Sequence, residues 1–104
     1  MMGHSNGGDM SVLYTRRHPK NVSKLITLDN RRFPLLKFKK LKTCTLRSCD
    51  QIADVGVIPC LKEQKKCHIE VIKLKNTFHN DMCNSATEEQ RIEILKYITD
   101  FLKK

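Results

Sequence analysis

Short runs of apolar and β-branched residues recur along most of the chain, with polar clusters between them. In chain order the runs cover residues 11–15, 23–28, 33–41, 43–47, 52–58, 67–75 and 77–83. Runs of about five residues at this spacing are typical of the strands of an antiparallel sheet. Asp29, Asn30 and Asn76 lie between runs and favour turns. The pattern therefore predicts a mainly β domain built from short antiparallel strands.

The end of the chain, from about residue 87, follows a different period. Apolar residues recur there at intervals of three and four and form one broad face, made of Ile92, Leu95, Ile98 and Leu102 with Ile94 and Phe101 beside them. Two overlapping capping boxes, residues 85–88 and 87–90, precede this face. We expect an amphipathic C-terminal helix that begins near Thr87 and packs on the sheet.

The composition is that of one soluble globular domain, with 104 residues of which 39% are hydrophobic and 30% charged. Residues 1–10 are rich in Gly, Ser and Asn and contain no apolar stretch, so we expect a flexible leader there. A single domain over residues 11–104 follows. No apolar run approaches the roughly 18 residues needed to span a bilayer. We therefore expect a cytoplasmic protein whose membrane association, if any, is peripheral.

The cysteines do not predict a metal site or a closed disulfide framework. There are five, an odd number, and none forms a C-x-x-C pair: Cys44, Cys49, Cys60, Cys67 and Cys83. We interpret them as reduced thiols that fill half-buried positions. We found no glycine-rich phosphate loop, paired carboxylates or metal-ligand pair that stands out, and we therefore expect a non-enzymatic protein without metal or cofactor.

Positive charge is concentrated in one part of the chain. Residues 11–48 contain eleven of the twenty Lys and Arg residues and a single acid, Asp29, in a chain of net charge +9. Unpaired cations are too costly to bury, so this segment must face water or an anionic partner. Lipid headgroups, phosphates and RNA are the natural candidates.

Three stretches of the chain resemble the pleckstrin homology (PH) domains. They are residues 28–35, similar to the second strand of that family; residues 42–52, similar to its fourth strand and the following turn; and residues 65–98, similar to its last strands and capping helix. The chain lacks the tryptophan that nearly marks the family, and Ile94 stands in its place. The resemblance implies a partly open barrel of antiparallel strands capped by one C-terminal amphipathic helix.

The resemblance also implies a ligand site. Residues 15–21 would form the turn between the first two strands, where basic residues of many family members grip the phosphates of an inositol lipid. The matching cations are Arg16, Arg17, Lys20, Lys24 and Arg31. Each exposed cation near an anionic leaflet contributes about 1 kcal/mol to attachment. We thus expect an adaptor module that binds phosphoinositide headgroups, or an acidic protein surface, through a basic β-hairpin.

Two other functions fit the same charges. A small, lysine-rich protein could be a structural component of a ribonucleoprotein or ribosome that binds RNA phosphates. Sparse aromatic residues and the lack of an RNP-type motif argue against base recognition. A chemokine-like cytokine is a third alternative, because Cys67 and Cys83 bracket a β-like segment ahead of the C-terminal helix.

Overall fold

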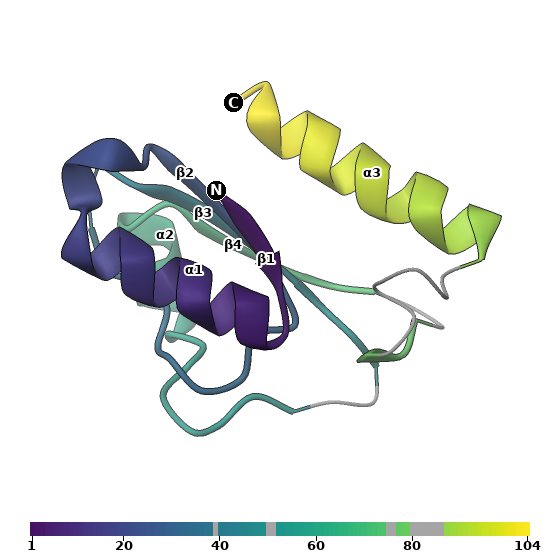
Figure 1. Ribbon diagram of the computed structural model, residues 1–104, viewed down its shortest axis with the longest axis horizontal. Coiled ribbons are helices and arrows are strands. Elements are labelled where there is room, and N and C mark those ends of the chain that lie inside the picture. Colours follow the sequence, from purple (N-terminus) through teal and green to yellow (C-terminus); the bar gives the residue numbers. More distant parts are fainter. Residues whose placement is uncertain (39, 50–51, 75–76, 80–86) are drawn as a thin grey trace.

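The computed structural model describes the whole chain except residues 39, 50–51, 75–76 and 80–86. Four strands lie side by side in chain order and run parallel (Figure 1). The elements are β1 (Met2–His4), α1 (Asn6–Arg17), a 3₁₀ turn (Pro19–Asn21), β2 (Lys24–Leu28), β3 (Lys42–Arg47), α2 (Leu61–Lys66), β4 (Ile69–Lys73) and α3 (Glu88–Leu102). The described residues therefore form an α/β structure.

The prediction of a PH-like barrel of antiparallel strands is wrong, because every strand pair is parallel. The burial of the strands gives the physical reason. Residues 25–28 of β2 and 43–47 of β3 are all buried, without the wet face that an antiparallel sheet commonly has. Strands buried on both faces are typical of parallel sheets covered by helices.

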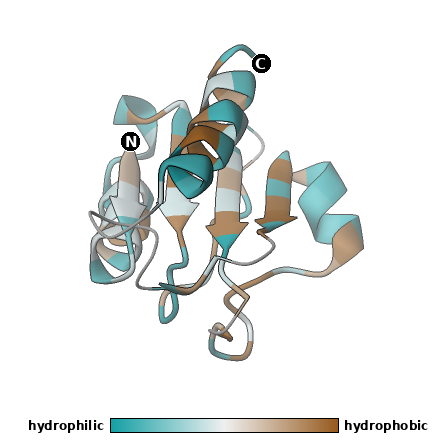
Figure 2. Ribbon diagram, turned by 90° about the vertical axis from the view of Figure 1, so that its right-hand side faces the viewer, coloured by the Kyte–Doolittle hydropathy of each residue, from teal (hydrophilic) through white to brown (hydrophobic). Residues whose placement is uncertain are grey.

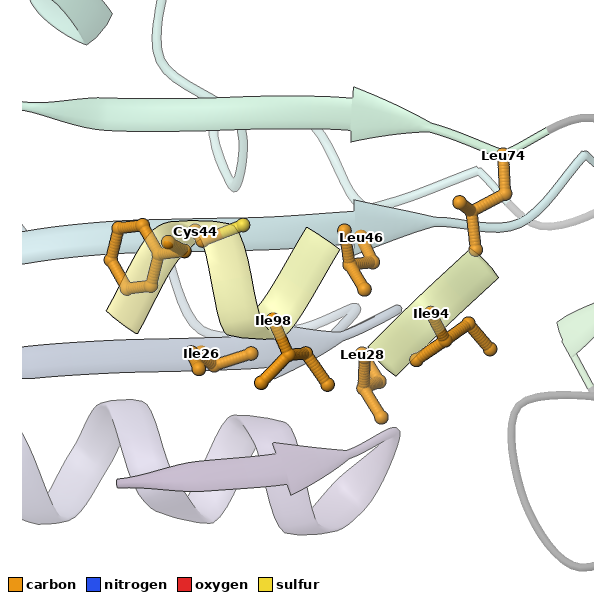
Figure 3. Close-up of a cluster of buried hydrophobic side chains, with 8 residues drawn as sticks. Ile26, Leu28, Cys44, Leu46, Leu74, Ile94 and Ile98 are labelled. Atoms are coloured by element: carbon orange, nitrogen blue, oxygen red, sulfur yellow. The ribbon is translucent and has the colours of Figure 1, made fainter. Parts of the chain in front are cut away.

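Each face of the sheet has its own apolar core. On one face, α1 and the loop before β3 cover Leu25 and Ile69, in a cluster that also includes Val12 and Leu36. On the other face, α3 packs on Ile26, Leu28, Cys44 and Leu46 (Figure 3). Figure 2 shows the apolar residues of the strands and α3 lying across them.

The C-terminal helix is confirmed, together with its cap. The Thr87 hydroxyl accepts a hydrogen bond from the backbone N–H of Gln90, and the Gln90 side chain accepts one from the backbone N–H of Thr87. The buried side is, however, rotated from the predicted face. It is formed by Ile94, Ile98 and Phe101, whereas three predicted members are more than half exposed, namely Ile92, Leu95 and Leu102.

Some of the predicted strands are confirmed and others are not. The runs 23–28, 43–47 and 67–75 overlap β2, β3 and β4 and are confirmed as strands. Residues 11–15 lie in α1, and the described parts of 33–41 and 52–58 form no strand. Most of the run 77–83 lies outside the described residues. None of the helices in the described parts of the chain is long and apolar enough to cross a bilayer.

Candidate active site

Polar residues lie together at the end of the sheet where the carboxyl ends of the parallel strands meet. Ser5 follows β1, Asp29 follows β2, and Ser48 follows β3. The segment after β4 returns to the same end with His79. In open α/β sheets ligands bind beyond the carboxyl ends of the strands, at a reversal of strand order. The described strands, in the order β1-β2-β3-β4, have no such reversal, so the site is identified by its side-chain contacts alone.

Three of these side chains form a hydrogen-bonded series. Asp29 Oδ2 lies 2.5 Å from His79 Nδ1, and His79 Nε2 lies 3.1 Å from Ser5 Oγ. With the proton on Nδ1, His79 donates to the carboxylate and accepts from the serine hydroxyl. Asp29 is fully buried, His79 keeps 17% of its side chain exposed and Ser5 is partly exposed. Burial in the series is therefore greatest at its carboxylate end.

Ser5 lies on a sharp turn between β1 and α1. Its dihedral angles are φ 53° and ψ −118°, in a region that L-residues rarely adopt. The turn is fixed on both sides, because the Ser5 N–H donates to the Leu28 carbonyl and the Ser5 carbonyl accepts from the N–H of Asp9. A strained serine held by two backbone hydrogen bonds is often a functional residue.

Glycines allow this turn to close. A Cβ added to Gly3 would lie 2.2 Å from the carbonyl oxygen of Gly7, and one added to Gly8 would lie 3.0 Å from the carbonyl oxygen of Gly3. The strand and the first turn of the helix are therefore in backbone contact. A side chain at position 3 would push α1, and with it Ser5, away from the sheet.

Both carboxylate oxygens of Asp29 have partners. Oδ1 accepts from the N–H of Ser48 at 3.1 Å and lies 3.6 Å from Arg47 Nη2. Oδ2 accepts from the Ser48 hydroxyl at 2.5 Å as well as from His79. Asp29 also has a positive φ of 59°, which aspartate tolerates better than most residues. The carboxylate is thus fixed in orientation.

A buried polar network holds Arg47 beside Asp29. The guanidinium donates to the side-chain oxygen of Asn30 at 2.9 Å, to its carbonyl at 2.7 Å and to the Thr45 hydroxyl at 3.1 Å. Thr27 joins the network through Asn30 and Thr45. Burial lowers the pKa of Arg47, while the nearby carboxylates of Asp29 and Asp9 act in the opposite direction.

Asp9 of α1 holds the loop that follows Asp29. Asp9 as a residue is 3% exposed, and its carboxylate accepts hydrogen bonds from the backbone N–H groups of Arg31, Arg32 and Phe33. The loop is thereby attached to the helix that carries Ser5 at its start. The serine and the acid are therefore held by the same elements.

His4 contacts the histidine of the series directly. Its Nε2 lies 3.1 Å from the His79 carbonyl oxygen, and the two rings stack with centroids 4.9 Å apart. Thr77 supports the same segment, because its carbonyl accepts from the N–H of Cys49. The position of His79 is therefore fixed from β1 and from the loop after β3.

The cations predicted to bind a headgroup lie elsewhere and do not form one group. Arg16 and Arg17 end α1, Lys20 lies in the 3₁₀ turn and Lys24 begins β2, all at the amino end of the sheet. Arg31 lies at the carboxyl end, where its side chain is 3.7 Å from Asp54. The expected β-hairpin is absent, because a helix joins β1 to β2.

The residues of the hydrogen-bonded series were missed, although the sequence contains a signal for one of them. Residues 3–7 read Gly-His-Ser-Asn-Gly, a G-x-S-x-G pattern. A flexible leader is expected over residues 1–10, but β1 and the start of α1 lie there. Asp29 is expected in a turn and His79 inside a predicted strand.

Three cavities among the described residues lie away from this site. One of about 690 Å³ is lined by residues 19–20, 22–23, 37–38 and 40–41, one of about 480 Å³ is lined by Met1, Tyr14, residues 21–24 and Leu102, and one of about 430 Å³ is bounded by α2, β4 and the end of α3. All three are at the amino end of the sheet. The four described cysteines are free thiols, and the described residues contain no cluster of three or more His, Cys, Asp or Glu suited to a metal ion.

Comparison with protein-family models, curated proteins and solved structures finds no match to this chain. The site is therefore interpreted from its own geometry.

Proposed function

We propose that the chain carries the acyl-transfer centre of a serine hydrolase, with Ser5 as nucleophile, His79 as general base and Asp29 as the acid that orients His79. The observation that supports this most directly is the series of two hydrogen bonds from Asp29 through His79 to Ser5. A nucleophile within hydrogen-bond reach of a base that a third group orients is the diagnostic arrangement for such chemistry.

The turn that presents Ser5 supports the same proposal. In α/β-hydrolases the nucleophilic serine occupies a sharp turn between a strand and a helix, within G-x-S-x-G. The triad of those enzymes follows in the chain order serine, acid, histidine. Ser5, Asp29 and His79 have this order, and Ser5 joins β1 to α1. The likeness is one of local geometry and chain order.

The proposed reaction has two halves. Ser5 Oγ attacks the carbonyl carbon of an ester, thioester or amide, and its proton passes to His79 Nε2 as the new C–O bond forms. The tetrahedral intermediate then collapses, the bond to the leaving group breaks, and His79 returns the proton to that group. Water, deprotonated by His79, attacks the acyl-enzyme and releases the carboxylic acid with regeneration of the Ser5 hydroxyl.

The first turn of α1 supplies electrostatic support for the oxyanion. The first N–H groups of a helix have no partner within the helix, and its amino end carries partial positive charge. The N–H of Asn6, which follows Ser5, corresponds to the oxyanion donor that follows the nucleophile in α/β-hydrolases. A donor fixed in this way stabilises the charge that develops on the substrate oxygen.

The non-enzymatic binding module expected from the sequence remains an untested prediction. It depends on five cations, of which four lie at the amino end of the sheet and Arg31 at the other. A cytoplasmic location with peripheral membrane association is likewise a prediction. The hydrolase proposal is preferred because it depends on groups that the fold brings into hydrogen-bond contact.

Labelling with a fluorophosphonate probe tests the proposal. We expect the full chain to form a covalent adduct at Ser5, located by peptide mass spectrometry, and to hydrolyse p-nitrophenyl acetate. Ser5→Ala and His79→Ala should abolish labelling, whereas Ser23→Ala, which changes an exposed serine at the amino end of the sheet, should not. Equal labelling of Ser5→Ala and the unchanged chain would exclude Ser5 as the nucleophile.

A further inference from the structure

Arg47 carries a fixed charge in the interior, next to the acid of the proposed triad. Only 8% of its side chain is exposed, and its Nη2 lies 3.6 Å from Asp29 Oδ1. A buried guanidinium is tolerated when it is both paired and hydrogen-bonded. Arg47 meets both conditions, since Asn30 and Thr45 accept from the same guanidinium.

The two oxygens of Asp29 face different partners. Oδ1 faces Arg47 and the Ser48 N–H, while Oδ2 faces His79 and the Ser48 hydroxyl. A turn of the carboxylate plane out of this arrangement would break the contacts of both oxygens, including the one with His79. The cation beside one oxygen therefore favours the plane in which the other oxygen faces the histidine.

We propose that Arg47 is a positioning residue for the triad, which holds the Asp29 carboxylate turned toward His79. This inference deepens the proposed hydrolase function and rests on it. Arg47 does not reach Ser5 or the reacting atoms, and it acts through Asp29.

The other groups around Asp29 cannot replace this charge. From β1 and α1 the site is faced by His4, Ser5 and Asp9, from the loop after β3 by Ser48, and from the segment after β4 by His79. An imidazole carries charge only when it is protonated, and Asp9 is an acid. Among the described residues that surround Asp29, Arg47 is thus the permanent cation, because arginine stays charged at every pH at which proteins work.

Removing this charge should change how the site responds to pH. In Arg47→Gln an amide can still donate to Asn30, but the positive charge beside the carboxylate is lost. Without this cation the carboxylate should stabilise the protonated form of the base more strongly, so the acid limb of labelling, which reports protonation of the base, should move upward by about one pH unit. Labelling near pH 6 should fall roughly tenfold, with a much smaller loss near pH 8.5.

The experiment compares the full chain with Arg47→Gln and Arg47→Lys. The rate of fluorophosphonate labelling at Ser5 is measured from about pH 5.5 to about pH 9. In parallel, proton NMR follows the far-downfield signal of the proton shared by Asp29 and His79, which requires no reaction. Arg47→Lys keeps the charge, so it should restore the unchanged chain's acid limb and the downfield signal.

The outcomes separate the two proposals. A pH-dependent loss in Arg47→Gln that Arg47→Lys rescues, in labelling and in the NMR signal, supports the positioning role. The same loss at every pH, no loss, or failure of Arg47→Lys to rescue would overturn it while leaving the hydrolase proposal intact. If Ser5 is never labelled but the NMR signal still depends on the charge at position 47, the hydrolase proposal fails and the positioning of Asp29 stands.

A folding control keeps the test decisive. Thermal unfolding of each variant shows whether it is native at the temperature of measurement. If Arg47→Gln is unfolded at that temperature, the test depends on Arg47→Lys, which keeps the positive charge. A shift of one pH unit in the acid limb of Arg47→Lys would then contradict a role for the charge. An unshifted limb supports it.

Discussion

Charged residues are exposed at the amino end of the sheet, here called the amino edge, and buried at the carboxyl end, here called the carboxyl edge. At the amino edge, Arg16, Arg17 and Lys20 are exposed, and Lys24 donates to the Leu102 carbonyl. At the carboxyl edge, Asp29 and Arg47 are buried and face each other within a connected set of hydrogen bonds. Exposed cations gain little from any single contact, whereas buried charges require fixed partners. The side chains at the carboxyl edge are therefore held in the fixed geometry that the proposed catalysis requires.

The largest expected effect comes from the acid itself. Asp29→Asn should lower the rate of p-nitrophenyl acetate hydrolysis by about 10³–10⁴-fold, because the amide favours the wrong tautomer of the histidine. Asp54→Asn provides the matched control, since Asp54 is an exposed partner of Arg31. Similar hydrolysis rates for the two variants would contradict a special role for the buried acid.

The buried network should matter for stability. Asn30→Ala removes the side-chain acceptor of the Arg47 guanidinium and should lower the free energy of unfolding by about 2–4 kcal/mol, since a charged group loses its partner. Lys24→Ala at the amino edge should cost about 0–1 kcal/mol. Urea denaturation of both variants gives the comparison. An equal loss in the two would contradict the contrast between the edges.

The turn at Ser5 offers a test with two neighbouring glycines. Gly3→Ala places a methyl group against the Gly7 backbone and should lower stability by about 1–3 kcal/mol, with loss of Ser5 labelling. Gly7→Ala meets no atom within 4 Å and should fold and label normally. Thermal unfolding and probe labelling measure both effects. If Gly3→Ala is tolerated as well as Gly7→Ala, the close approach of β1 and α1 is not what fixes the turn.

The smallest effect is expected at the exposed arginines. Arg16→Ala combined with Arg17→Ala should change the free energy of unfolding by less than about 0.5 kcal/mol, as surface substitutions usually do. Co-sedimentation with phosphoinositide-containing liposomes at low and high salt tests the predicted headgroup binding. Loss of salt-sensitive binding in the double variant would support a lipid role for the amino edge, and unchanged binding would contradict it.

Local patterns in the sequence were sufficient for some elements. The apolar runs around Leu25, Leu46 and Val71 mark three of the strands, and the capping box at Thr87 marks the start of α3. Strand direction is not encoded in such runs, because the same residues fit a parallel or an antiparallel neighbour. Complete burial of both faces was the available clue, since residues 25–28 contain no charged residue.

The candidate site was harder to predict, because its members are far apart in the chain. His79 is 50 residues from Asp29 and 74 from Ser5, and only the parallel order of the strands brings them to one edge. The spacing of Gly3, Ser5 and Gly7 is visible in the sequence and matches the G-x-S-x-G pattern. Nothing near His79 distinguishes it from an ordinary exposed histidine, and Arg47 is indistinguishable from the surface cations until its burial is known.

The attachment of residues 31–33 to Asp9 has a consequence for how the reaction centre assembles. The proposed nucleophile and acid are held by the same elements, because the helix that starts at Ser5 also anchors the loop after Asp29. The proposed base, His79, lies on a separate segment that contacts these elements through His4 and through the hydrogen bond between Cys49 and Thr77. We therefore expect displacement of that one segment to separate the imidazole from the serine and the carboxylate without disturbing the other two.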